Sequence, residues 1–229
     1  LGNRDPELIG RVVALLHAAG RYGDADSELV KLEQQAIPFT NEFGRLAADV
    51  SLRVEDYVDA AQYALQVARD SDEYEMLVWA GQVAGLSQDE EVQREAVERL
   101  RSAIELAPER PAAWLALIRF HVRYERMEKA QKVVNEASTA IDSEHSAIAL
   151  AQAYELMGQL DEAERRYSAA VESVPIRPVA VNEAARFYRD QRRPDDAERL
   201  LRLLLSPELK DSAEIELDLS QVRRDLGVI

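Results

Sequence analysis

Alanine recurs along this chain at intervals of 33–36 residues, and a second small or apolar position follows each alanine by seven residues. The first series is Ala25, Ala60, Ala96, Ala130, Ala163 and Ala197, and the second is Leu32, Val67, Ala103, Ala137, Ala170 and Leu204. A fixed period of this size marks a stacked repeat protein, in which each unit is one helix pair packed on its neighbours. Such an array presents long surfaces, so the period favours binding over catalysis in an enclosed pocket.

Composition narrows the classes of partner. The formal net charge of −15 argues against nucleic acid or an anionic membrane as the main partner, because both require clustered Lys and Arg. Hydrophobic residues make up 47% of the chain, which is enough to cover the inner faces of many helices. The sequence has no cysteine, which excludes disulfides and thiol chemistry. No apolar run approaches the ~18 residues of a membrane-spanning helix.

The clearest repeat unit runs from about residue 144 to residue 177. Its first predicted helix ends at Gly158, since glycine tolerates the left-handed conformation that a helix end needs. Asp161 and Glu162 then place negative charge at the positive end of the next helix dipole. That helix ends before Pro175. Its apolar face carries Ala163, Tyr167, Ala170 and Val171.

The stretch LAQAYELMGQLDEAERRYSAAVESVP in this unit resembles the tetratricopeptide repeat (TPR) family. The likeness consists of a small residue where two helices approach, an aromatic residue one turn later, Gly in the turn, Ala early in the second helix and Pro after it. Trp114 and Leu117 precede Ala130 in the preceding unit, and Tyr188 precedes Ala197 in the following one. The resemblance covers about residues 6–209.

The resemblance implies an all-α fold, a right-handed superhelical array of antiparallel helix pairs (a TPR-like solenoid) with a C-terminal capping helix. We expect twelve helices in six pairs. The expected pairs span about 6–39, 40–72, 73–110, 111–143, 144–177 and 178–209. Residues 210–229 form the expected cap, whose apolar stripe carries Ile215, Leu219, Val222 and Leu226. A cap of this kind shields the apolar side of a terminal repeat.

The sequence contains no recognisable catalytic or metal-binding constellation. None of His17, His121 and His145 is paired with another His or a Cys at metal-ligand spacing. We expect His121 to pack in the core, because it falls in the same column as Tyr154 and Tyr188. No nucleotide-binding loop or hydrolase motif occurs. The sequence therefore predicts a protein that is not an enzyme, with no catalytic residue, no cofactor and no metal.

In the resembled family, the first helix of each pair lines a concave groove, and its non-packing face contacts peptide ligands. This geometry implies a candidate peptide groove formed by Arg119, Arg123, His145, Gln152, Asn182, Arg186 and Arg189. Arg119, Gln152 and Arg186 fall in one column, so we expect them to form a row across three helices. Arginines in a groove favour an acidic or carboxylate-bearing peptide, because Arg donates bidentate hydrogen bonds. Alternatively, these arginines pair with acidic residues of their own wall, namely Glu155, Glu183 and Asp190.

These features predict a non-enzymatic protein–protein interaction scaffold, whose partner is a protein or peptide, with acidic peptides as one class. We expect neither nucleic-acid binding nor direct membrane insertion. The chain begins at Leu1 and shows no targeting segment, so we expect a fragment of a longer protein and slightly favour the cytoplasm. One alternative is a regulatory or substrate-docking arm of a larger enzyme, whose catalytic domain lies outside this fragment. Another is a structural role through self-association.

Overall fold

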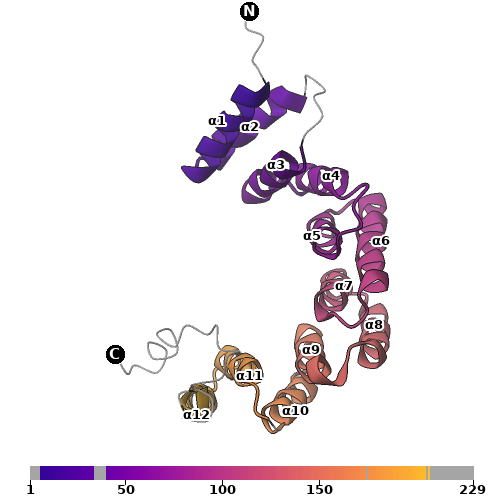
Figure 1. The fold of residues 1–229 in the computed structure, drawn as a ribbon, viewed down its shortest axis with the longest axis vertical. Coiled ribbons are helices and arrows are strands. Elements are labelled where there is room, and N and C mark those ends of the chain that lie inside the picture. Colours follow the sequence, from indigo (N-terminus) through magenta and orange to yellow (C-terminus); the bar gives the residue numbers. More distant parts are fainter. Residues whose placement is uncertain (1–5, 34–39, 174, 205, 207–229) are drawn as a thin grey trace, which may run out of the picture. The chain divides into compact units, whose positions relative to one another are not determined.

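The computed structural model describes residues 6–33, 40–173, 175–204 and 206. These residues form twelve α-helices and no strand (Figure 1), which confirms the all-α fold class. None of the helices in this part of the chain is long and apolar enough to cross a membrane. The predicted cap, residues 210–229, lies outside the described residues.

The chain divides into two compact units, residues 1–120 and 121–229. The first contains α1 (Pro6–Ala18), α2 (Tyr22–Glu33), α3 (Asn41–Arg53), α4 (Tyr57–Val67), α5 (Tyr74–Ala84), α6 (Glu90–Leu106) and most of α7 (Pro111–Arg123). The second contains α8 (Met127–Ala140), α9 (Ser143–Leu156), α10 (Leu160–Val171), α11 (Pro178–Asp190) and α12 (Pro194–Leu204).

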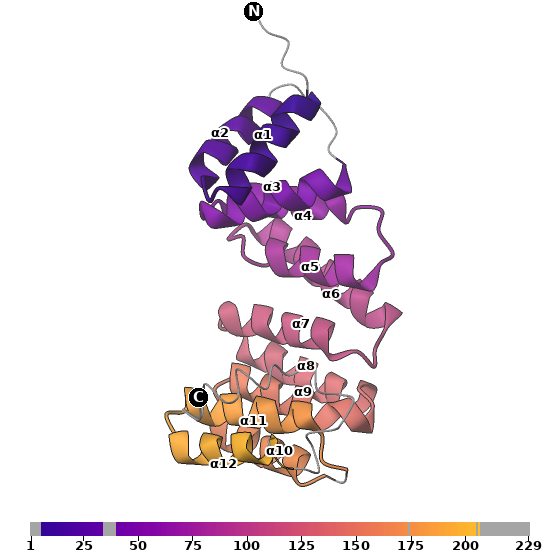
Figure 2. The same ribbon diagram turned by 60° about the vertical axis from the view of Figure 1, so that its left-hand side comes forward.

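Within each unit, helices that follow one another in the chain pack side by side (Figure 2). In the first unit α1 packs on α2, α3 on α4 and α5 on α6, while contacts of α2 with α3 and of α4 with α5 join these pairs. In the second unit α9 packs on α10 and α11 on α12, and α10 also contacts α11. Each amphipathic helix buries its apolar stripe against its neighbours, so the core runs from pair to pair.

Five connections between described helices are three-residue turns with the same backbone geometry. Their middle residues have φ between 54 and 72°, and are Gly20, Glu55, Glu125, Gly158 and Arg192. In each turn the middle amide donates to the carbonyl three residues earlier, and the next amide donates to the carbonyl five residues earlier. This Schellman arrangement satisfies carbonyl groups at the helix end. The helix end predicted at Gly158 is confirmed.

The two recurring series of small and apolar residues lie in the helix contacts, as the period predicts. The six alanines of the first series are 0–5% exposed, and the members of the second series are 0–8% exposed. Two glycines allow a still closer approach. A Cβ atom on Gly81 in α5 would lie 2.6 Å from Cγ of Leu100 in α6, and one on Gly44 in α3 would overlap Val67 of α4. These helix pairs therefore approach to a distance that a larger side chain would prevent.

Candidate functional site

In the second unit, α9 and α11 each bury an apolar face. Side chains on the polar face of α9 meet side chains on the polar face of α11. The polar face of α9 carries Gln152 and Glu155, three residues apart. The polar face of α11 carries Glu183, Arg186 and Asp190, spaced by three and four residues. Residues at these spacings share one side of a helix, so the fold brings the two sets together.

Arg186 is the centre of this polar group. Its Nη1 and Nη2 donate to Oε1 and Oε2 of Glu155 at 3.0 and 2.9 Å. Its Nε donates to Glu183 at 3.2 Å, and Nη1 also donates to Asp190 at 3.1 Å. Gln152 extends the group, because its Nε2 donates to the same Glu183 oxygen at 2.9 Å. These bonds tie α9 to α11 through side chains alone.

Tyr167 of α10 adds a third helix to the group. Its side chain is fully buried, and its hydroxyl donates to Glu155 at 2.7 Å. The hydroxyl oxygen also accepts from Nη2 of Arg186 at 3.2 Å. The ring packs on Phe187, with 5.0 Å between the ring centroids. We refer to Gln152, Glu155, Tyr167, Glu183, Arg186 and Asp190 together as the Arg186 cluster.

The electrostatics of the Arg186 cluster favour a structural role over proton transfer. Burial raises the pKa of Tyr167 above its ordinary value, and the hydrogen bond to Glu155 raises it further. The hydrogen bond to Glu155 likewise raises the pKa of Arg186. Both groups therefore keep their protons at neutral pH. No group of three or more potential ligand side chains that could hold a metal occurs among the described residues.

The seven predicted groove residues lie in different environments. Gln152, Asn182 and Arg186 are half-buried, and Arg189 is exposed on α11. Arg119 and Arg123 are exposed on α7, while the side chain of His145 lies outside the described residues. His121, which is not a groove residue, is 6% exposed, which confirms its predicted burial.

Two members of the predicted row come together, because Gln152 and Arg186 both donate to Glu183. Arg119 belongs to the other unit. Arg186 forms ion pairs with Glu155, Glu183 and Asp190. These are the pairs expected in the alternative interpretation, in which the groove arginines bind neighbouring acidic residues instead of a ligand. Its role in ligand binding stays a prediction.

No pattern in the sequence indicates the part that Tyr167 plays, because its partners lie on other helices rather than at a helical spacing. The same is true of a second polar group in this unit. Arg193 donates to both carboxylate oxygens of Glu164 at 2.8 and 2.9 Å, and its guanidinium lies 4.6 Å from the ring centroid of Tyr188. The Tyr188 hydroxyl donates to Glu164 at 3.2 Å. At two places in this unit an arginine thus pairs with a distant glutamate, from α11 in the case of Arg186 and from the turn before α12 in the case of Arg193.

Part of the chain matches a known repeat. Residues 94–153 match the family model described as tetratricopeptide repeat. A tetratricopeptide repeat protein from Parabacteroides merdae shares the fold at 10% sequence identity and a TM-score of 0.50, over 98% of this chain and 85% of that one. No curated protein matches the sequence.

Two further solved structures are similar at lower TM-scores. A thermophilic TPR protein from Thermus thermophilus is 22% identical, with a TM-score of 0.43, over 79% of this chain and 97% of that one. The Pseudomonas aeruginosa protein pilF is 16% identical, with a TM-score of 0.43, over 90% and 95% of the two chains.

Proposed function

Because this chain belongs to the tetratricopeptide repeat family, we propose that it is a non-enzymatic scaffold that binds a peptide or partner protein on its first helices. The contacts would be made by the polar face of α7, the polar face of α9 and the polar face of α11. We call these three separate surfaces the first-helix faces. They carry Arg119 and Arg123 on α7, Gln152 on α9, and Asn182, Arg186 and Arg189 on α11. Repeat proteins use extended surfaces to bind their partners.

The observation that best supports this proposal is the environment of Asn182. Asn182 is a partly exposed residue of α11, and its side-chain amide makes no hydrogen bond to any described residue. A side-chain amide offers two donor hydrogens and one acceptor oxygen, which match the backbone of a bound peptide. The side-chain amide of Asn182 is not among the buried unpaired atoms, so it is open to solvent and available to a partner.

The exposed arginines support an acidic partner. Arg119 and Arg123 are exposed on α7 and form no ion pair with a described residue, so they are available to acidic side chains of a peptide. Arg186 contributes less, because its donors already meet three carboxylates. Each charge-assisted contact is worth ~1.5–3 kcal/mol when desolvated and close to zero when it stays exposed.

The proposal is tested by probing a peptide array with the labelled protein. We expect Arg119→Gln/Arg123→Gln to lose signal on acidic peptides, and Asn182→Ala to lose signal on peptides of every charge. Arg165→Gln is the matched control, because Arg165 is 74% exposed on α10, a second helix. An array pattern that is identical in the wild type and all three variants contradicts the first-helix faces as the binding site.

A further inference from the structure

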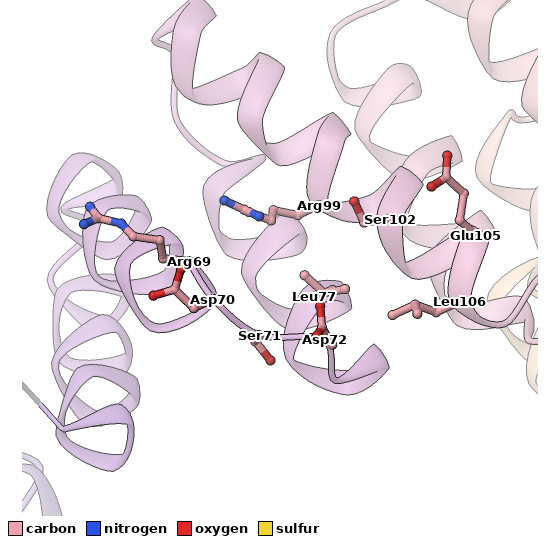
Figure 3. Close-up of a pocket in the computed structure, with 9 residues that line it drawn as sticks. All are labelled: Arg69, Asp70, Ser71, Asp72, Leu77, Arg99, Ser102, Glu105 and Leu106. Atoms are coloured by element: carbon pink, nitrogen blue, oxygen red, sulfur yellow. The ribbon is translucent and has the colours of Figure 1, made fainter.

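The first unit carries two surface features that the packing of its helices does not explain. One is a pocket of about 490 Å³ between the segment that joins α4 to α5 and one side of α6 (Figure 3). Its wall mixes carboxylates with guanidinium groups, so it has no preference for a charged ligand; these groups belong to Asp70, Asp72, Glu105, Arg69 and Arg99. The other feature is the outer side of α1, where large apolar residues are exposed.

The helix α1 has apolar residues on two sides. On one side Ile9 and Val13 are 3% and 0% exposed, in the core that α1 shares with α2 and α3 (Figure 2). On the other side Leu8 and Leu15 are 58% and 71% exposed, the highest values for large apolar side chains in the described part of the chain. Val12, which is partly exposed, lies between them at helical spacing. We call Leu8, Val12 and Leu15 the α1 stripe.

The repeat period identifies the α1 stripe as one half of a helix interface. A shift of one period, 35 residues here, takes it to Phe43, Ala47 and Val50 of α3. Ala47 and Val50 are fully buried, in the core cluster that also contains Leu29 and Leu32 of α2. In α3 these positions therefore pack against the helix pair before it, whereas in α1 they are apolar and open to water. An apolar surface of this kind marks an interaction site.

A second copy of the chain cannot cover the α1 stripe in head-to-tail order. The matching half would be the equivalent residues of the last second helix, Ala197, Leu201 and Leu204 of α12. These residues are 5%, 9% and 0% exposed, so they are not available to another molecule. A two-fold contact needs no matching half, because both copies use the same surface.

The α1 stripe is suited to a contact with itself. Its order is Leu, Val, Leu, so it is the same in both chain directions. In an antiparallel arrangement Leu8 of each copy lies opposite Leu15 of the other, and Val12 lies near the two-fold axis. This is the self-complementarity that an isologous interface requires.

The charges of α1 allow two copies to approach. Besides His17, the helix carries only Glu7 and Arg11, whose charges cancel, although the whole chain has a net charge of −15. Arg11 is exposed beside the α1 stripe, and two-fold symmetry brings the Arg11 side chains of both copies to the same side of the contact. Charge therefore opposes the contact, which depends on the burial of apolar surface.

We propose that the α1 stripe is a self-association surface, through which two copies of this chain form an antiparallel two-fold dimer. Each copy covers Leu8 and Leu15 of the other and removes their apolar surface from water. The contact consists of a few side chains from each copy, so the dimer is weak and depends on concentration. It uses no residue of the first-helix faces and goes beyond the peptide binding proposed for them.

Sedimentation equilibrium of the full chain, from about 5 μM to about 1 mM, tests the proposal. We expect a monomer–dimer equilibrium, and Leu8→Glu/Leu15→Glu should raise its dissociation constant at least about tenfold. The matched control is Val58→Glu, which changes an apolar residue of α4 that is 57% exposed and should leave the dissociation constant unchanged. Circular dichroism should give the same helix content for all three proteins, because every substituted side chain is exposed.

Salt separates this apolar contact from an ionic one. Screening of the repulsion between two copies should strengthen the dimer as salt rises from about 0.05 M to about 0.5 M, whereas a dimer held by ion pairs would weaken. A chain that stays monomeric up to about 1 mM would overturn the proposal, and so would a dimer that weakens with salt or survives in Leu8→Glu/Leu15→Glu.

A single cysteine tests the two-fold arrangement. The chain has no cysteine, so Val12→Cys introduces one thiol per copy. A disulfide needs Cα atoms within about 7 Å, a distance that residues near the two-fold axis can reach. Mild oxidation should link Val12→Cys into a covalent dimer and leave the control Val58→Cys mainly monomeric. Equal linking of the two variants would contradict the antiparallel pairing of α1.

Discussion

Arg186 of α11 and Glu155 of α9 form a bidentate pair between two helices, although they lie 31 residues apart in the sequence. The side chains are 34% and 19% exposed, so water screens the pair only partly. Parallel hydrogen bonds of this kind fix both orientation and distance. The pair therefore links α9 to α11 directly through their side chains in the second unit.

Removal of this arginine should destabilise the second unit. Arg186→Ala leaves Glu155, Glu183 and Asp190 without their shared cation, so we expect a loss of about 1–3 kcal/mol in the free energy of unfolding. Arg165→Ala, which removes an exposed ion pair on α10, should cost less than about 0.5 kcal/mol. Urea denaturation followed by circular dichroism measures both values. Equal losses would mean that the Arg186 cluster contributes no more than a surface pair.

The Tyr167 hydroxyl should contribute to stability in a pH-dependent way. Tyr167→Phe removes the bond to Glu155 and should cost about 1–2 kcal/mol at neutral pH. The pKa of Tyr167 is raised in the folded state by burial. Its contribution is therefore fully present below the ordinary tyrosine pKa of about 10, and is lost as the pH rises through the folded-state pKa. Above pH ~10, the wild type should lose stability more steeply than Tyr167→Phe.

Urea midpoints of the two proteins, measured across this alkaline range, check the prediction. The ultraviolet absorbance of tyrosinate provides a second measurement, because the folded wild type should retain one late-ionising phenol that Tyr167→Phe lacks. Parallel stability profiles would contradict the assigned position of the hydroxyl.

Three of the helix-ending turns place a non-glycine residue at positive φ, namely Glu55, Glu125 and Arg192. The left-handed conformation costs a residue with a Cβ roughly 1–2 kcal/mol. Glycine avoids this cost but loses more backbone entropy on folding than a residue with a Cβ, which offsets part of the gain. Each substitution to Gly should therefore stabilise the protein by about 0.5–1 kcal/mol. Thermal unfolding of the triple variant measures the summed effect.

The reverse substitution serves as the control. Gly158 already has φ 72°, and a Cβ there would meet no atom within 4 Å. Gly158→Ala should therefore destabilise by about 0.5–1 kcal/mol through the backbone alone. Stabilisation by this change would show that the turn does not need a left-handed residue.

Gly81 should tolerate alanine poorly. In most helix interiors, Gly→Ala stabilises by about 0.5–1 kcal/mol. At Gly81 the new Cβ would lie 2.6 Å from Cγ of Leu100, a fully buried side chain, and 3.1 Å from the backbone oxygen of Ala96. We expect overpacking to dominate, with a net loss of about 1–3 kcal/mol in thermal or urea unfolding. Gly23→Ala in α2, where a Cβ meets nothing within 4 Å, should instead gain about 0.4–1 kcal/mol.

The fold can be predicted well from the sequence because it repeats. Small residues at Ala130 and Ala163 recur at one period and are completely buried, so their positions alone indicate where helices cross. Gly158 marks a helix end, since glycine is the residue that a left-handed turn prefers. Glu55 and Arg192 adopt the same turn without such a marker, so these turns can be placed only from the period.

The candidate site is harder to predict than the fold. The column that holds Gln152 and Arg186 identifies residues on neighbouring helices, and the two do share Glu183 as a partner. An arginine at an equivalent position of the repeat can be free or paired. Which of the two applies depends on the carboxylates that lie within its reach. Tyr167 belongs to α10, the second helix of the α9–α10 pair. The sequence predicts that its ring is buried, but it does not indicate that the hydroxyl donates to Glu155.

The repeated Schellman turns also bear on how the chain loses its structure. Each turn is closed by hydrogen bonds between residues at most five positions apart, so no turn depends on another for its own bonds. In stacked units of this type, an end pair can open locally before the array as a whole unfolds. Amide hydrogens of α1 and α12 should therefore exchange with solvent sooner than those in the interior of each unit. Local opening of α1–α2 or of α11–α12 is therefore possible while the remaining pairs stay folded.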